Sequence, residues 1–300
     1  MNTAIKRAFD KASLQTTCAS LISLVKPRIL FMVVLTATLG FLLSCDGKDL
    51  PLLLLGYLCV GTAMACAGSN MLNCYIEREY DARMERTKNR PLVTGAVAPE
   101  TALFLGEVLV LGGVVLLVVK VSLLVGFLSL LSSFVYVLVY TPLKRRTWLN
   151  TMIGAIPGAL PPLAGWLAAG GEMNLCAIAL FLLLFTWQQP HFFAIAYMYK
   201  EDYKKAGFKM LPVVDPDGRA TLVQSVLFSV ALFIVSLAIG AYASLGMIYL
   251  MGATVLGFMM IQRSFALGRT PEYADAKRLL RTSVLYLPAY FMVVMADFIV

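Results

Sequence analysis

The feature of this sequence that most limits its fold is a series of long apolar runs that carry almost no charge. Each run is close to the roughly 20 residues that an α-helix needs to cross the hydrocarbon layer of a bilayer. Of the 300 residues, 60% are hydrophobic and only 14% are charged, which is far more apolar than an average soluble domain. We therefore expect an all-α, polytopic membrane protein whose solvent is lipid.

Nine transmembrane helices are predicted, and they are expected to surround a central cavity. Their expected ranges are 28–45, 51–72, 101–119, 121–140, 150–169, 174–197, 221–241, 246–262 and 282–300. Residues 28–300 are expected to form a single transmembrane domain that follows an amino-terminal segment, residues 1–27. This segment lacks the pattern of a cleavable signal peptide, so it is expected to stay attached. It also lacks a long Arg- and Ser-rich leader, which favours a bacterial inner membrane over an organellar one.

Lysine and arginine are distributed unequally between the two sides of this arrangement. Of the 25 basic residues, 23 fall in the amino-terminal segment or near the loops on its side, and only Lys48 and Lys120 fall on the other side. Because basic residues near span ends are retained in the cytoplasm, the amino terminus and these loops are predicted to be cytoplasmic. The net charge of +8 then reflects topology, and nucleic acid is not an expected partner.

An amide and two acids follow the second predicted span at regular spacing. Asn73, Glu77 and Asp81 are each four residues apart, and on a helix such positions lie on one face. Their oxygens suit Mg²⁺, which takes one or two carboxylates and fills its other positions with water and substrate phosphate. Cations that can bind phosphate follow directly, namely Arg86, Lys88 and Arg90. The alternative is a solvated loop whose mixed charges pair with each other.

Two more charged stretches lie on the same predicted side. The stretch after the sixth span contains Lys200, Glu201, Asp202 and Lys204. It can share a site with the first stretch only if the inner ends of the second and sixth helices are neighbours, which is an assumption. The stretch after the fourth span contains Lys144, Arg145 and Arg146. The simpler explanation of these three basic residues is membrane topology.

Two features lie inside predicted spans. His191, the only histidine, follows Pro190, and an ionisable residue within a span suggests function. The alternative is that His191 hydrogen-bonds backbone carbonyls freed by the proline. The fifth span contains glycines and prolines over residues 154–162 and is expected to bend or unwind, either to make room for a cavity or for close packing.

Five sequence blocks extend these observations. They read N-x-Y-I-E-R-E-Y-D-x-x-M-E-R-T-K-N-R-P-L at 73–92, Y-T-P-L-K-R-R-T-x-x-N at 140–150, I-G-A-I-P-G-A-L-P-P-L-A-G-W at 153–166, W-Q-Q-P-H-F-F-A-I-A at 187–196 and D-Y-K-K-A-G-F-K-M-L-P-V-V at 202–214. With them the chain resembles the UbiA-type intramembrane prenyltransferases. The first block indicates the whole superfamily, whereas the later blocks together resemble its haem-farnesylating branch.

The resemblance implies transfer of a farnesyl group from farnesyl diphosphate to a vinyl group of haem B, with addition of water and release of pyrophosphate. It implies catalytic roles for Asn73, Glu77, Asp81 and Asp202 and Mg²⁺ as cofactor, held by these residues and Glu201. For this substrate pair we predict diphosphate contacts from Arg86, Lys88, Arg90, Lys200 and Lys204. Contacts with haem are predicted for His191, Lys144, Arg145 and Arg146. A haem A synthase that consumes the product is an expected partner.

The chain departs from the family pattern at two points. Glu77 replaces the usual Asp, so the metal role survives but its geometry could change. The second motif has Asp202 with Glu201 in place of two Asp four residues apart. Two rival functions stay open: a related enzyme that prenylates a quinone precursor or a chlorin, and a non-catalytic membrane carrier or assembly subunit.

Overall fold

The structure, a computed structural model, describes residues 18–45, 50–269 and 272–299. In these ranges the regular secondary structure is entirely helical. Nine of the helical segments are long and apolar enough to cross a membrane. The expectation of an all-α polytopic protein is thus confirmed, while the central cavity stays a prediction.

Eight of the spans are single helices and the fourth is composite. The single helices are α2 (Pro27–Cys45), α3 (Leu52–Asp81), α5 (Pro99–Lys120), α8 (Asn150–Ala168), α9 (Leu175–Met198), α12 (Arg219–Tyr242), α13 (Met247–Arg269) and α14 (Tyr273–Ile299). The fourth span joins α6 (Leu123–Phe134), the π-helical turn η1 (Val135–Tyr140) and α7 (Thr141–Leu143). The short helices are α4 (Pro91–Thr94), α10 (Lys200–Lys205) and α11 (Leu211–Val214).

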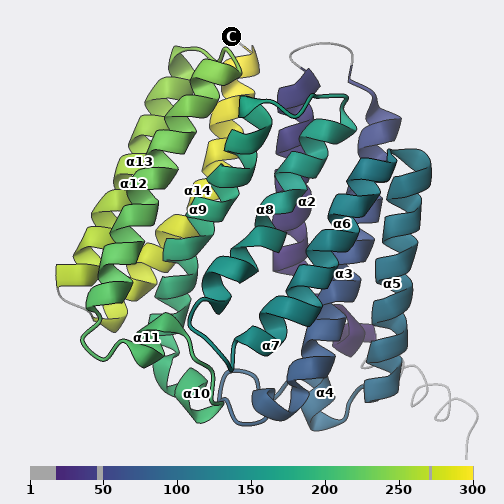
Figure 1. The fold of residues 1–300 in the computed structure, drawn as a ribbon, viewed down its shortest axis with the longest axis vertical. Helices are drawn as coiled ribbons and strands as arrows, with labels where there is room; N and C mark the ends of the chain where they lie inside the picture. The colour runs from purple at the N-terminus through teal and green to yellow at the C-terminus, as the bar shows by residue number, and fades with distance from the viewer. Residues whose placement is uncertain (1–17, 46–49, 270–271, 300) are drawn as a thin grey trace, which may run out of the picture.

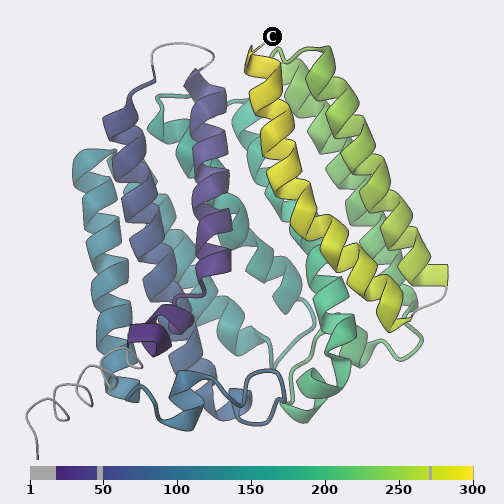
Figure 2. The same cartoon turned by 180° about the vertical axis from the view of Figure 1, so that it is seen from behind.

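The spans run alternately up and down, so their connections fall at two opposite ends of the bundle (Figures 1 and 2). The short helices α4, α7, α10 and α11 gather at one end, and the carboxyl terminus lies at the other (Figure 1). The end with the short helices, called the inner end below, carries the loops that were predicted to be basic and cytoplasmic. Lys48, one of the two exceptions, lies outside the described residues.

Three span boundaries differ clearly from the prediction. The second helix continues to Asp81 instead of ending at 72, the eighth continues to Arg269 instead of 262, and the ninth begins at Tyr273 instead of 282. Hydropathy marks only the part of a helix that matches the hydrocarbon layer. All three helices continue through charged residues outside their apolar parts, so the Asn73–Asp81 motif belongs to a 30-residue helix.

The centre of the bundle is made by α8 and α9. Of their most apolar windows, 72% and 56% are buried within the protein, against 28–39% for the other spans. Although α8 contains Pro157, Pro161 and Pro162, it stays helical from Asn150 to Ala168, so the stretch does not unwind, and a bend stays a prediction. A Cβ on Gly40 of α2 would lie 1.9 Å from the carbonyl oxygen of Pro162, and one on Gly165 would lie 1.9 Å from the carbonyl oxygen of Ala37 in α2. The small residues of α8 thus serve close helix packing, which was one of the two alternatives.

The amino-terminal segment is described from residue 18 onward, and residues 18–24 are helical. Leu24 is buried against Met71 and Cys74 of α3 and against Leu92 of α4. This packing places Lys26, which has a positive φ of 53°, beside the polar part of α3. Residues 18–26 therefore contribute to the inner end of the bundle.

Candidate active site

The polar face of α3 lies buried at the inner end of the bundle. Asn73, Glu77 and Asp81 are 1%, 5% and 1% exposed, respectively. The alternative of a solvated loop with paired charges is therefore wrong for these three residues. It does describe Glu85 and Lys88, which are exposed and form an ion pair of 2.5 Å.

Each of the three side chains is bound by one cation from a different part of the chain. The pairs are Lys26 Nζ with Asn73 Oδ1 at 2.7 Å, Lys144 Nζ with Glu77 Oε1 at 2.7 Å, and Arg90 Nη1 with Asp81 Oδ2 at 2.5 Å. Three cations therefore face two carboxylates and an amide. The cluster carries a net positive charge when all its ionisable groups are charged.

The cations differ in how firmly they hold their protons. Burial opposes the charge of Arg90 and of Lys144, but the carboxylates of Asp81 and Glu77 outweigh this effect and raise the pKa of both groups. Lys26 faces the neutral amide of Asn73, and burial lowers its pKa. The two carboxylates therefore stabilise the positive charges of Arg90 and Lys144, whereas the amide of Asn73 gives Lys26 no such countercharge.

Neighbouring hydrogen bonds hold the amide end of the cluster in place. Asn73 Nδ2 donates to Thr141 Oγ1 at 3.0 Å, and Thr141 Oγ1 donates to the carbonyl oxygen of Tyr136 at 2.8 Å. Asn70, one turn before Asn73, donates from Nδ2 to the carbonyl oxygen of Val25 at 3.1 Å. Lys26, Asn70 and Thr141 were not predicted to be site residues. A usable signal was the polar Asn70 inside an apolar span.

The oxygens of this cluster fit a magnesium ion that shares its coordination with a phosphate ligand. Asp81 Oδ1 is buried and has no hydrogen-bond partner within the described part of the chain, so one carboxylate oxygen is left for a further ligand. The described residues contain no group of three or more His, Cys, Asp or Glu side chains that could hold a metal by themselves. Mg²⁺ usually binds to one or two carboxylates plus substrate phosphate and water, and the residues present match that pattern.

The second acidic stretch lies next to the loop that follows α3, as the prediction of adjacent helix ends required. Asp202 Oδ2 accepts a hydrogen bond of 3.2 Å from the backbone nitrogen of Arg86. The Arg86 guanidinium lies over the rings of Tyr199 and Tyr203, at 5.0 and 5.8 Å from their centroids. Glu201 and Lys204, however, are exposed. The two stretches thus contact each other through Arg86 and through a hydrophobic cluster that contains Met84 and Tyr203.

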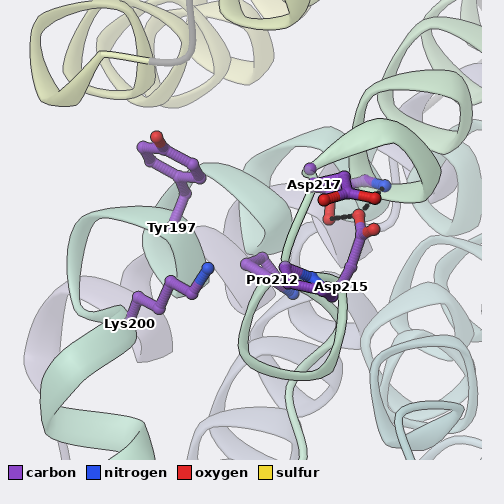
Figure 3. A pocket seen from close by; sticks show the side chains of 8 residues that line it. Tyr197, Lys200, Pro212, Asp215 and Asp217 are labelled. Carbon is purple, nitrogen blue, oxygen red and sulfur yellow. Dashed lines mark hydrogen bonds between the residues drawn. The ribbon is translucent and has the colours of Figure 1, made fainter.

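Lys200 lies in a different environment. It lines a pocket with Tyr197, Pro212, Asp215 and Asp217, and no α3 residue contributes to this pocket. Figure 3 shows Lys200 and Tyr197 on one side and the two acids on the other. Asp215 itself caps α12, because its Oδ2 accepts from the backbone nitrogen and the hydroxyl of Thr221, each at 2.8 Å. These contacts do not join Lys200 to the α3 cluster.

The residues predicted to contact haem are found in three different settings. Lys144 lies against Glu77 and over the Tyr140 ring, with Nζ 4.6 Å from the ring centroid, so it has a buried partner in addition to any role in membrane topology. The reason is that Glu77, buried on α3, needs a countercharge. Arg145 and Arg146 are exposed, and the Arg145 side chain donates to the hydroxyl of Tyr80.

His191 is half-buried and contacts α14. Its Nδ1 lies 2.8 Å from the hydroxyl of Ser283. The alternative that it satisfies carbonyls freed by Pro190 is therefore wrong, because its hydrogen-bond partner is a side chain of another helix.

This fold and site define the class of the protein. Residues 33–287 match the UbiA prenyltransferase family, so the chain belongs to this family. The resemblance seen in the sequence blocks is confirmed, and with it the expectation of a prenyl-transferring enzyme.

Curated relatives carry a more specific name, protoheme IX farnesyltransferase. The relative from Solibacter usitatus is 39% identical over 284 residues, which cover 92% of this chain and 97% of the relative. The one from Salinibacter ruber is 41% identical over 275 residues, 91% of this chain and 96% of the relative. The similarity thus extends over nearly the whole length of both proteins.

Solved structures of the same fold are more distant in sequence. A digeranylgeranylglyceryl phosphate synthase structure is 17% identical, covers 94% of this chain and 99% of its own, and has a TM-score of 0.78. A UbiA homologue from Archaeoglobus fulgidus, solved with DMAPP and Mg²⁺, is 18% identical with a TM-score of 0.66 and covers 92% of this chain and 99% of its own. These likenesses establish the fold of the bundle.

Proposed function

We propose that this protein transfers the farnesyl group of farnesyl diphosphate to a vinyl group of haem B, with addition of water, to give haem O and pyrophosphate. The observation that carries the proposal is the nearly full-length similarity, at 39% and 41% identity, to relatives named protoheme IX farnesyltransferase. The buried cluster on α3 supports it, because the departing diphosphate is an anion that needs such charges.

Asn73, Glu77 and Asp81 would hold Mg²⁺, with Asp202 and Glu201 completing the site from α10. The bound ion would supply positive charge to the diphosphate as it departs. The chain supplies more of this charge through Lys26, Arg90 and Lys144, which are fixed before the substrate arrives. These positive charges would lower the activation free energy for separating the allylic cation from diphosphate.

Among the predicted diphosphate contacts, Arg90 has the strongest structural support, because it is half-buried and bonded to Asp81. The residues Arg86, Lys88 and Lys204 are exposed, although Arg86 lies over Tyr199 and Tyr203, and Lys200 lines the separate pocket. The farnesyl chain would lie among the apolar spans, where water that could capture its cation is excluded.

Haem B would bind from the bilayer, with His191 near its iron and Arg145 and Arg146 near its propionates. The distribution of basic residues supports an orientation with the inner end in the cytoplasm. We infer a bacterial inner membrane as the location and a haem A synthase as the enzyme that consumes the product. No feature of the described residues favours the quinone, chlorin or carrier alternatives.

The proposal is tested by incubating the purified protein in lipid nanodiscs with farnesyl diphosphate, haem B and Mg²⁺. We expect haem O by mass spectrometry and equimolar pyrophosphate, and we expect both to disappear with EDTA and to return with excess Mg²⁺. Pyrophosphate release that requires a quinone precursor instead of haem B would move the protein to the quinone branch. Absence of any metal-dependent pyrophosphate release would overturn prenyl transfer itself.

A further inference from the structure

Ser283 of α14 holds two aromatic side chains of α9. Trp187 Nε1 donates to the carbonyl oxygen of Ser283 at 2.9 Å, and His191 Nδ1 lies 2.8 Å from Ser283 Oγ. The Trp187 and His191 rings are also stacked, with centroids 4.9 Å apart and an angle of 21° between their planes. The imidazole is therefore held on one ring face and at one nitrogen.

The hydrogen bonds of Ser283 favour one tautomer of His191. Ser283 Oγ lies 2.8 Å from the carbonyl oxygen of Leu280, to which it donates. A serine hydroxyl has only one proton, and a carbonyl has none to give. With the hydroxyl proton on the Leu280 carbonyl, the proton between Ser283 and His191 comes from the imidazole. This arrangement favours the tautomer with its proton on Nδ1, in which Nε2 keeps a free lone pair.

The lone pair on Nε2 is not used by the protein. Among the described residues, Ser283 is the one hydrogen-bond partner found for His191. The side chain is half-buried, so part of its surface stays accessible. His191 precedes the last residue of α9, Met198, by seven positions, or roughly 10 Å of helix. It therefore lies within the apolar part of the bundle, deeper than the end of that helix.

We propose that Ser283 is a positioning residue for the acceptor substrate: it fixes His191 with its proton on Nδ1, so that Nε2 is presented to the iron of haem B. This inference rests on the proposed function and adds to it the ligating nitrogen and the residue that selects it. A histidine that ligates a metal commonly donates its other ring proton to a fixed acceptor, which sets the ring orientation. Ser283 supplies this acceptor, and Trp187 limits rotation of the ring.

The test uses the full-length protein in nanodiscs with ferric haem B and no farnesyl diphosphate. The variants are Ser283→Ala, Ser283→Thr and His191→Ala. The matched control is Ser264→Ala, which removes a buried hydroxyl that is bonded to Ser229 at 2.8 Å in the same part of the chain. Absorption and electron paramagnetic resonance spectra report imidazole ligation, and titration gives the dissociation constant for haem.

We expect the wild type, Ser264→Ala and Ser283→Thr to show an imidazole-ligated haem spectrum. His191→Ala should lose it and regain it with added imidazole. Ser283→Ala should bind haem about 10-fold to 100-fold more weakly and give a mixed spectrum. Its KM for farnesyl diphosphate should stay that of the wild type. If Ser283→Ala matches Ser264→Ala in affinity and spectrum, Ser283 has no positioning role.

Two outcomes separate this inference from the proposed function. A wild type that makes haem O but binds haem without imidazole ligation would overturn the inference alone, even if Ser283→Ala fails to fold. A wild type that binds haem through His191 but never forms haem O would overturn the proposed function and with it the acceptor role, while ligation of the iron by His191 would stand.

Discussion

The acidic stretches of α3 and α10 contain the same kinds of side chain at the same end of the bundle, but the protein treats them differently. Glu77 and Asp81 are almost fully buried, and each is bonded to a cation. Glu201 is exposed, and Asp202 is half-buried and bonded to the backbone nitrogen of Arg86. The supporting elements explain the contrast, because α3 has 30 residues and packs within the bundle, whereas α10 has six.

The two stretches thus form a buried, hydrogen-bonded cluster on α3 and a more exposed one on α10. The charges of the α3 cluster are desolvated and oriented by their partners, which is the arrangement that stabilises developing charge most effectively. The α10 stretch is connected to it through Arg86 and the rings of Tyr199 and Tyr203. We expect substitutions in the two stretches to differ in size and in kind.

The largest effect is expected for Asp81→Asn. The change removes the negative charge that would hold Mg²⁺ and leaves Arg90 without its partner. We predict that kcat for pyrophosphate release falls by roughly 10² to 10³. Thermal unfolding of the variant in detergent serves as the control for folding. A kcat near that of the wild type would remove Asp81 from the reaction.

Lys144→Met should lower the free energy of unfolding more than any substitution in α10. The substitution leaves the buried carboxylate of Glu77 without a countercharge. Removing one partner of a buried ion pair lowers the free energy of unfolding by about 3–5 kcal/mol. The double variant Glu77→Gln/Lys144→Met should recover most of this lost stability, because it removes both charges. Lys88→Met is the matched control, because it breaks the exposed pair with Glu85 and should cost less than about 1 kcal/mol. Equal shifts in the unfolding midpoint for Lys144→Met and Lys88→Met would contradict the comparison.

Asp202→Asn should have an intermediate effect. The amide keeps an oxygen that can accept from the Arg86 backbone, so the loop contact is retained while a charge is lost. We expect kcat/KM for farnesyl diphosphate to fall by about tenfold, the cost of roughly 1.4 kcal/mol of transition-state stabilisation. A loss as large as that of Asp81→Asn would show that the two stretches contribute equally.

The smallest effect is expected for Lys204→Ala. Its side chain is exposed, and surface substitutions of this type usually change stability by less than about 0.5 kcal/mol. The KM for farnesyl diphosphate should change less than twofold. A large increase in KM would mean that α10 moves toward the diphosphate when substrate binds.

The spacing of residues along the chain was sufficient to predict much of this molecule. Apolar runs predicted the nine spans, and the distribution of basic residues predicted which loops share one end. The interval of four between Asn73, Glu77 and Asp81 predicted one helical face. These are properties of local geometry, so they depend only on neighbours in sequence. Hydropathy failed at the helix ends because α3, α13 and α14 continue beyond their apolar parts.

The sequence by itself determined the membrane class, the family and the helix face that carries the acids. Only the tertiary structure decided which cation neutralises which acid, since Lys144 lies 67 positions after Glu77. It also decided that His191 is bonded to Ser283, which lies 92 positions further along the chain. The physical reason is that such pairs form where separate helices pack against each other. The helical period of a sequence indicates which residues share one face of a helix, but not which other helix that face will contact.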